Sequence, residues 1–213
     1  KRAAMVKAIG GLIDGAVKGD TLVITYSGHG TWVPDSSGDE PDGRDEGLCP
    51  YDLVSRGALI DDDIHELFAR RAAGVRIVLI SDSCHSGSVT RGEEADLDPD
   101  LPRVRFMPPQ AWMKGTLPPA FLSTVTPRGG FSRAGGDLLL AGCQDTEYSW
   151  DTRFHGRPNG AFTYYALKTL RENKPTTYQK WFDAIRAYLP STRLPQSPQI
   201  LGTRTSRSFK LFK

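Results

Sequence analysis

Apolar positions along the chain switch between helical and strand spacing, and this alternation predicts the order of the elements. Residues 1–18 carry apolar side chains at roughly helical spacing, and Gly19-Asp20 closes that segment. The β-branched run 21–26 predicts a buried strand, and the near-continuous apolar run 75–81 is typical of a strand covered on both faces of a parallel sheet. Three aspartates followed by helical spacing predict a second helix over 61–73.

The last third of the chain continues this alternation. A third core strand is predicted over 137–142, and helices are predicted over 160–172 and 177–189. Residues 208–212 are predicted to close the sheet. Alternating strands and helices predict the α/β class, with a mostly parallel central sheet flanked by helices.

Two stretches lack any apolar periodicity. Residues 35–46 place acidic side chains among glycines and prolines, a composition that predicts a loop, and a hairpin is predicted over 53–60. Residues 89–136 are predicted to form an exposed insert, because so long an irregular stretch is rarely part of a compact core. We therefore expect a single domain over 1–213, built from residues 1–88, the insert, and residues 137–213.

Composition excludes several classes of protein. The chain has 213 residues, 38% of them hydrophobic, which is enough for a core, and a net charge of +2 without basic clusters argues against a nucleic-acid partner. No apolar run approaches the roughly 20 residues that span a bilayer, so no membrane partner is expected. Three cysteines, Cys49, Cys84 and Cys143, argue against a disulfide framework and predict a reducing, cytoplasmic location.

Candidate chemistry lies where two predicted parallel strands end. His29 and Cys84 each follow such a strand, and ligands bind at this edge of open α/β sheets. A thiolate attacks a carbonyl and an imidazole transfers the proton, so the pair could hydrolyse an amide, with the backbone N–H groups of Gly30 and Cys84 binding the oxyanion. The spacing alone leaves the alternative open that Cys84 is a small buried apolar residue and His29 a packed side chain.

The segments YSGHGTWVPDSSGDEPDGRDEGLCPYD and DSCHSGS resemble the two catalytic segments of metacaspases, a family of caspase-like cysteine peptidases. The segments AGCQDTEYSWD, GRPNGAFTYYAL and PQSPQILG resemble the small-subunit region of bacterial members. The resemblance implies a caspase-like fold with His29 as general base and Cys84 as nucleophile. It gives His85 no catalytic role, and we interpret His85 as a loop side chain.

The resemblance also implies a pocket for the residue before the cleaved bond. Ser27 and Asp82 match positions that line this pocket in metacaspases, and a carboxylate there favours Arg or Lys. The alternative for Asp82 is an acid that caps its strand end. Because exposed loops are readily nicked, self-cleavage is expected after basic residues of the insert, for which the candidates are Arg103, Arg105, Lys114, Arg128 and Arg133.

Many metacaspases bind calcium, which takes hard oxygen ligands. The position matching the fourth ligand of the family holds Arg91, with Glu93 and Glu94 close by but out of register. The alternative is that the aspartates at 61–63 only begin a helix. The matched calcium positions in this sequence are Asp45, Asp61 and Asp62.

The sequence therefore predicts a cysteine endopeptidase that acts on peptides and proteins after Arg or Lys, without an organic cofactor. The resemblance implies a further strand and helix that precede the first helix and add an acidic pocket residue, which these 213 residues do not include. A fragment, a processed form and a shortened member all remain open. The alternative functions are a catalytically silent caspase-like scaffold module and a peptidase of the same fold with the specificity of separases or gingipains.

Overall fold

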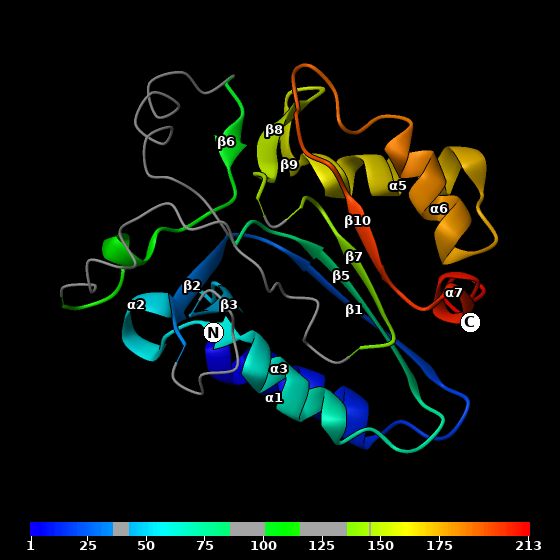
Figure 1. The fold of residues 1–213 in the computed structure, drawn as a ribbon, viewed down its shortest axis with the longest axis horizontal. Helices are drawn as coiled ribbons and strands as arrows, with labels where there is room; N and C mark the ends of the chain where they lie inside the picture. Colours follow the sequence, from blue (N-terminus) through cyan, green and yellow to red (C-terminus); the bar gives the residue numbers. More distant parts are fainter. Residues whose placement is uncertain (36–42, 86–100, 116–135, 145) are drawn as a thin grey trace.

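A four-stranded sheet forms the centre of the protein (Figure 1). Its order is β1-β5-β7-β10; the first three strands run parallel, and β10 pairs antiparallel with β7 at the edge. The predicted α/β class with a mostly parallel sheet is confirmed. The strands are β1 (Thr21–Ser27), β5 (Arg76–Asp82), β7 (Leu138–Ala141) and β10 (Gln199–Gly202). The structure is a computed structural model that describes residues 1–35, 43–85, 101–115, 136–144 and 146–213.

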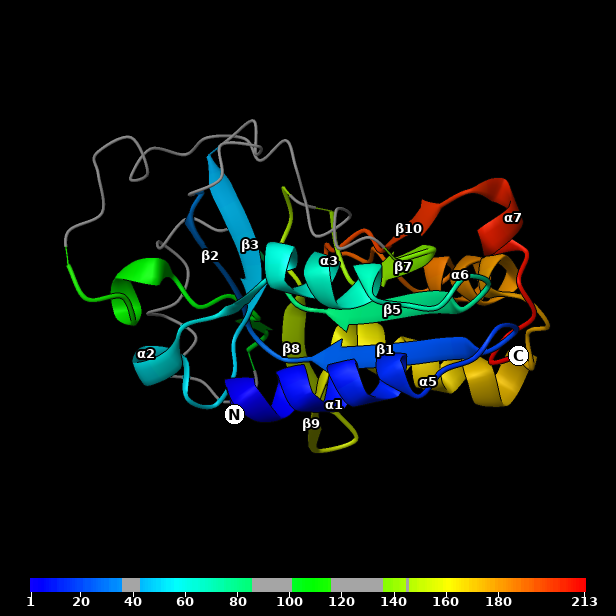
Figure 2. The same cartoon turned by 90° about the horizontal axis from the view of Figure 1, so that it is seen from below.

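Helices cover both faces of this sheet, as Figures 1 and 2 show from two directions. Helices α1 (Arg2–Asp14) and α3 (Asp61–Ala69) lie on one face, and α5 (Ala161–Asn173) and α6 (Tyr178–Arg186) lie on the other. All four were predicted from helical spacing, with bounds that differ by a few residues. The middle of β5, residues 77–80, is apolar because its side chains alternate between two cores.

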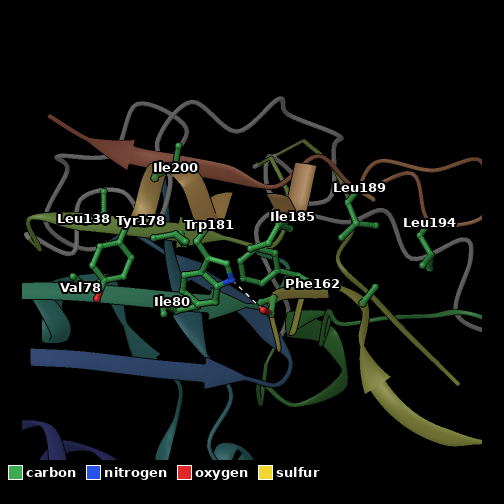
Figure 3. Close-up of a cluster of buried hydrophobic side chains, with 13 residues drawn as sticks. Val78, Ile80, Leu138, Phe162, Tyr178, Trp181, Ile185, Leu189, Leu194 and Ile200 are labelled. Atoms are coloured by element: carbon green, nitrogen blue, oxygen red, sulfur yellow. Dashed lines mark hydrogen bonds between the residues drawn. The ribbon is translucent and has the colours of Figure 1, made fainter. Parts of the chain in front are cut away.

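The core beneath α5 and α6 is rich in aromatic side chains (Figure 3). Val78 and Ile80 of β5 point into it and pack with Phe162 and Trp181. The indole Nε1 of Trp181 donates a hydrogen bond to the carbonyl of Ala166 at 3.0 Å, so this polar atom is satisfied inside the core. This packing fixes α5, whose first turn reaches the candidate site described below.

A second, antiparallel sheet stands beside the first and corrects two predictions. It contains β2 (Gly30–Pro34), β3 (Arg44–Leu48) and the short β4 (Leu59–Ile60). The predicted loop over 35–46 is therefore wrong for its last three residues, which are buried in β3. The charged side chain of Arg44 can be buried because its guanidinium carbon lies over the Trp32 ring, 4.2 Å from the ring centre.

The predicted hairpin over 53–60 is also absent. Its first half forms the short helix α2 (Leu53–Arg56), and its second half pairs with β3 instead. Leu53 packs with Ala58 and Trp112 in a small separate core, and this contact stabilises a helical turn where the apolar pattern alone indicated a strand.

A third sheet contains part of the predicted insert. Strand β6 (Arg103–Val104) pairs with β8 (Trp150–Phe154), which pairs with β9 (Arg157–Gly160). A single 3-10 turn, η2 (Pro109–Ala111), follows β6, and buried Trp112 donates from its indole to the Thr31 hydroxyl at 2.9 Å. The exposed-insert prediction is thus wrong for Arg105, Pro109 and Trp112, which are buried, because non-local pairing orders a stretch without periodicity of its own. Arg128 and Arg133 of the insert lie outside the described residues.

The chain end differs from the prediction as well. Residues 208–212 were expected to close the sheet, but that place is taken by β10, whose Ile200 is buried in the core. A short helix, α7 (Arg204–Arg207), follows β10, and after it Lys210 forms a single bridge with Thr177. In the described parts of the chain, no helix is long and apolar enough to cross a membrane.

Candidate active site

The two predicted reactive segments lie side by side at the carboxyl end of the sheet. Strands β1 and β5 pair in parallel with Ser27 opposite Asp82, so His29 and Cys84 each follow two residues after this last pair. The segments are in close contact: a Cβ placed on Gly30 would lie 2.1 Å from the carbonyl oxygen of Cys84. Residue His29 keeps contact with solvent although its ring is partly desolvated, whereas Cys84 is fully buried.

The surroundings of the three cysteines differ. The Cys84 thiol donates to the carbonyl of Glu147 at 3.2 Å. A hydrogen bond with Cys84, together with burial, raises the pKa of the Cys143 thiol well above its ordinary value. Burial raises the pKa of the Cys49 thiol to about 12. Cys49 and Cys143 are therefore held as neutral thiols, which are poor nucleophiles, and Cys84 remains the candidate.

The two backbone N–H groups predicted to bind an oxyanion converge on one atom. The N–H groups of Gly30 and Cys84 both donate to the carbonyl oxygen of Arg105, at 2.9 Å and 3.2 Å. Arg105 belongs to the predicted insert and is more than 20 positions from either donor. The geometry of an oxyanion site is thus present, and a peptide carbonyl of the same chain lies in it.

The side chain of Arg105 enters a pocket beside this carbonyl. Its guanidinium donates to the Ser27 hydroxyl at 2.9 Å and to the Asp151 carboxylate at 2.7 Å, and it lies 3.8 Å from the Asp82 carboxylate. Its Nε donates to the carbonyl of Gly28 at 3.3 Å. Arg105 is only 4% exposed. The two residues predicted to line a pocket, Ser27 and Asp82, therefore both contact a buried guanidinium.

Asp82 is held rigidly in this pocket. One carboxylate oxygen accepts from the Ser149 hydroxyl at 2.6 Å, and the other accepts from the backbone N–H and the hydroxyl of Thr163, at 2.9 Å and 2.6 Å. Thr163 lies in the first turn of α5, where the helix dipole favours a negative charge. The alternative interpretation, that Asp82 caps its own strand end, does not describe these contacts, because the carboxylate accepts from the first turn of a distant helix and also faces the guanidinium.

Two residues of the pocket were not predicted from the sequence. Asp151 adds a second carboxylate. Gly160 has no side chain and so leaves the space in which the guanidinium lies. A Cβ at this position would be 2.0 Å from Arg105 Nη1 and 2.2 Å from Asp82 Oδ2. Both lie in segments that resemble the metacaspase small subunit. The only local signal was a glycine before a predicted helix, where a Ser, Thr, Asp or Asn cap is more common.

His29 is expected to titrate below the ordinary histidine pKa of 6.5. Burial lowers its pKa and the Arg105 guanidinium lowers it further, while the Asp151 carboxylate opposes them. An NMR titration of the ring should therefore give a midpoint below 6.5, and the variant Asp151→Asn should move the midpoint lower still, because it removes the charge that stabilises the imidazolium. Asp183→Asn, on the exposed side of α6, is the control and should leave the midpoint unchanged. A midpoint at or above 6.5 in wild type would contradict the expectation.

His85 lies in the irregular segment that follows β5, as expected of a loop side chain, but its ring is packed against its neighbours. Its ring lies against β2, where a Cβ on Gly30 would be 2.8 Å from Nδ1, and its Nε2 is 3.0 Å from the Ser83 hydroxyl. Burial lowers the pKa of His85 to about 4, although hydrogen bonds with the backbone of Thr31 and Gly47 act in the opposite direction. The ring is therefore neutral near pH 7 and packs between the strand end and the second sheet.

The predicted calcium ligands lie in the second sheet and the start of α3. Asp45 and Asp61 are buried and Asp62 is partly exposed, while the position of Arg91 and its glutamate neighbours is outside the described residues. Within the described ranges, no three His, Cys, Asp or Glu side chains are grouped closely enough to hold a metal ion. Asp63 begins α3 as expected, since its carboxylate accepts from the N–H of Ile60 at 3.1 Å.

Comparisons with known proteins agree with this geometry. Residues 1–91 match the family model described as "Metacaspase, peptidase C14 domain". Metacaspase-1A of Aspergillus oryzae is 30% identical over 93% of this chain and 53% of its own length, and metacaspase-1B of Neosartorya fischeri is 30% identical over 93% and 54%. The chain spans about half the length of the curated relatives it matches. The crystal structure of protein GSU0716 from Geobacter sulfurreducens aligns with a TM-score of 0.67 and 31% identity, covering all of this chain and 78% of that one.

The central sheet is mostly parallel, and a histidine and a cysteine follow two adjacent parallel strands of it. A pocket that holds a guanidinium group lies beside them. This arrangement is that of a caspase-like domain. Residues 1–91 thus match the metacaspase family model, and the chain is similar to metacaspases over most of its length.

Proposed function

We propose that this protein is a cysteine endopeptidase that hydrolyses peptide bonds after Arg or Lys. One observation carries the proposal: a peptide carbonyl lies on the N–H groups of Gly30 and Cys84 while the arginine side chain of the same residue lies between Asp82 and Asp151. A site that binds a main-chain carbonyl beside a candidate thiol, and a cationic side chain next to it, has the parts needed for acyl transfer after a basic residue.

Each residue has a distinct role in the proposed reaction. The Cys84 thiolate attacks the carbonyl carbon after His29 takes the thiol proton, and the Gly30 and Cys84 N–H groups stabilise the negative oxygen that forms. Donors of this kind are each worth about 10²–10³-fold in rate in other enzymes. His29 then gives the proton to the leaving amine, and water hydrolyses the thioester. The lowered pKa of His29 keeps its ring neutral, and able to accept a proton, near pH 7.

The pocket explains the proposed preference for basic side chains. Two carboxylates face the guanidinium, and an exchange of that side chain for aspartate would place a third negative charge beside them. Charge-assisted hydrogen bonds to Arg are directional, whereas Lys would bind as a point charge, so Arg is expected to be the better substrate.

Matched fluorogenic peptides that end in Arg, Lys or Asp test the proposal. We expect wild type to hydrolyse the Arg and Lys peptides at least about 100-fold faster than the Asp peptide, since each charge-assisted hydrogen bond contributes about 1.5–3 kcal/mol and two carboxylates contribute. An electrophilic peptide ending in Arg should label Cys84 in the same protein. Equal turnover of the Asp peptide would refute the specificity, and a protein that neither reacts nor turns over would be the silent module.

Calcium activation is proposed on the resemblance of Asp45, Asp61 and Asp62 to the family positions, and the same assay tests it. Hydrolysis of the Arg peptide is measured with added calcium and with a calcium chelator. A higher rate with calcium, lost on chelation, would support these ligands; the same rate in both would leave the aspartates with their structural roles only.

A further inference from the structure

The side chains of Cys84 and Cys143 meet at the carboxyl end of the central sheet. Cys84 follows β5 and Cys143 follows β7, and these two strands pair in parallel side by side (Figure 1). The N–H of Gly142 continues the pairing by donating to the carbonyl of Ser81 at 2.8 Å. Continued in the same register, the pairing sets Cys143 beside Ser83, the residue directly before Cys84.

Two contacts join the thiols. Cys143 Sγ lies 3.7 Å from the carbonyl oxygen of Ser83, against the peptide bond that links Ser83 to Cys84. A hydrogen bond also joins the thiol groups of Cys84 and Cys143. The chain after Cys143 stays close to the same atom, because the Cys84 thiol donates to the carbonyl of Glu147 at 3.2 Å.

The backbone that carries Cys143 is fixed in this position. The fully buried side chain of Gln196 donates to the carbonyl of Gly142 at 2.8 Å and accepts from the N–H of Trp150 at 3.1 Å. The Glu147 carboxylate accepts from the hydroxyl of Ser197 at 2.9 Å. Neighbouring strands lie about 4.8 Å apart, and a disulfide joins Cα atoms that are about 4.4–6.8 Å apart. Thiols at the ends of paired strands are therefore within its reach.

The surroundings of Cys143 differ from those of a thiol that is buried only for packing. Cys49 packs among apolar side chains in the small core around Trp112. Cys143 is buried as well, yet in the described parts of the chain it belongs to none of the apolar clusters. Its contacts are the carbonyl of Ser83 and the thiol of Cys84. Apolar packing thus explains the position of Cys49 but not that of Cys143.

We propose that Cys84 and Cys143 form a reversible redox pair: hydrogen peroxide oxidises them to a disulfide, which blocks the candidate nucleophile until the bond is reduced. The formation of the disulfide is independent of the proposed function, whereas its effect on hydrolysis rests on that function. Cys143 has no part in the proposed hydrolysis, so that reaction does not account for a second thiol in contact with the nucleophile.

The reaction balances with hydrogen peroxide as the oxidant. The Cys84 sulfur attacks one peroxide oxygen, so an S–O bond forms, the O–O bond breaks, and the departing hydroxide leaves as water with the thiol proton. The Cys143 sulfur then attacks the Cys84 sulfur of this sulfenic acid. The S–S bond forms, the S–O bond breaks, and the Cys143 proton leaves with the hydroxide as a second water. The two thiols lose two electrons, which reduce one peroxide to two waters.

The order of these steps follows from the two thiols. The contact with Cys84 and burial hold Cys143 as a neutral thiol, which reacts poorly with peroxide, so Cys84 is oxidised first. Cys84 is fully buried, which favours a small oxidant such as peroxide over a bulky disulfide. A second peroxide would take Cys84 to the sulfinic acid, which thiol reductants do not reverse. Because Cys143 is already in contact, disulfide formation is expected to outpace that second oxidation.

The test treats wild type, Cys143→Ser, Cys143→Ala and Cys49→Ala with hydrogen peroxide. After free thiols are alkylated, digestion without reductant should give two peptides joined through Cys84 and Cys143 from wild type and from the control Cys49→Ala. Hydrolysis of an Arg reporter peptide should be lost in both and return with dithiothreitol. Both Cys143 variants should lose hydrolysis permanently, with Cys84 as the sulfinic acid. Each protein is compared with its own untreated rate, so an effect of the substitution itself does not enter.

Either of two results would overturn the inference. Wild type in which Cys84 stays reduced, or gains oxygen without a bond to Cys143, has no redox pair at this site. Recovery of the Cys143 variants to the same extent as wild type would show that another group protects Cys84. The peptide masses are read without the reporter, so a failure of the proposed function is seen separately. Wild type that forms the joined peptides but never hydrolyses the reporter refutes the peptidase and leaves the redox pair standing.

Discussion

Replacement of Cys84 by alanine should reduce the hydrolysis of an Arg reporter peptide by about 10⁴-fold or more, the range found when a nucleophile of this kind is removed. The reason is that Cys84 is the thiol beside the two carbonyl-binding N–H groups, whereas burial and the hydrogen bond with Cys84 keep the neighbouring Cys143 thiol neutral. The measurement is kcat/KM of the purified variant with the fluorogenic peptide. The protein should remain folded, since the change removes a single small buried atom.

The matched control is Cys49→Ala. The Cys49 thiol packs in the small core around Trp112 and has its pKa raised to about 12, so its loss should leave hydrolysis within about twofold of wild type. His29→Ala should resemble Cys84→Ala, and the double variant should be little worse than either, because the two residues act as a unit. A Cys84→Ala protein that keeps a hundredth of the activity or more would assign the chemistry to another residue.

The variant Gly160→Ala should abolish cleavage after Arg while leaving the thiol reactive. The added Cβ would lie 2.0 Å from the guanidinium position and 2.2 Å from the Asp82 carboxylate, so it fills the pocket. The backbone of Gly160 has φ −63° and ψ 134°, which alanine adopts without strain. We expect a loss of about 100-fold or more in kcat/KM, since the guanidinium loses several charge-assisted hydrogen bonds at once.

Controls separate this pocket effect from a folding defect. Gly11→Ala in α1 has no atom within 4 Å of the new Cβ and should keep full activity. A small alkylating reagent should label Cys84 in Gly160→Ala to the same extent as in wild type, because the change does not reach the thiol. Asp82→Asn keeps the volume and removes the charge, and it should lower Arg turnover by about 10–100-fold. Unchanged Arg turnover in Gly160→Ala would place the specificity pocket elsewhere.

Asp151 is the second acidic residue of the pocket, and the sequence did not predict it. The resemblance implied an acidic pocket residue from a strand and helix that these 213 residues do not include, and the sequence offered no replacement. In the structure Asp151 provides a second carboxylate, at 2.7 Å from the guanidinium, through the pairing of β8 with β6. The pocket therefore combines strand ends of the central sheet, the first turn of α5 and a strand of the third sheet.

The sequence by itself determined the three parallel strands of the central sheet, its four covering helices and the candidate reactive pair. The run 77–80 in β5 is apolar because both faces of that strand are covered, so its composition reports its burial directly. The β-branched run 21–26 predicted the strand β1 correctly, but only Leu22 of that strand is buried. Parallel strands end at the same edge of a sheet, and that rule brought the segments of His29 and Cys84 together. Their proposed roles came from the motifs around them.

Only the tertiary structure decided what lies in the site. The guanidinium of Arg105 bonds to partners that are 46 and 78 positions away, Asp151 and Ser27, and no periodicity encodes contacts between such distant residues. The burial of Arg44 against Trp32 and the pairing of β10 in place of residues 208–212 likewise depend on non-local neighbours. The pattern of apolar residues in the sequence indicates which side chains are buried. A buried charge also needs specific partners that compensate the cost of removing it from water. Those partners come together only when the chain has folded.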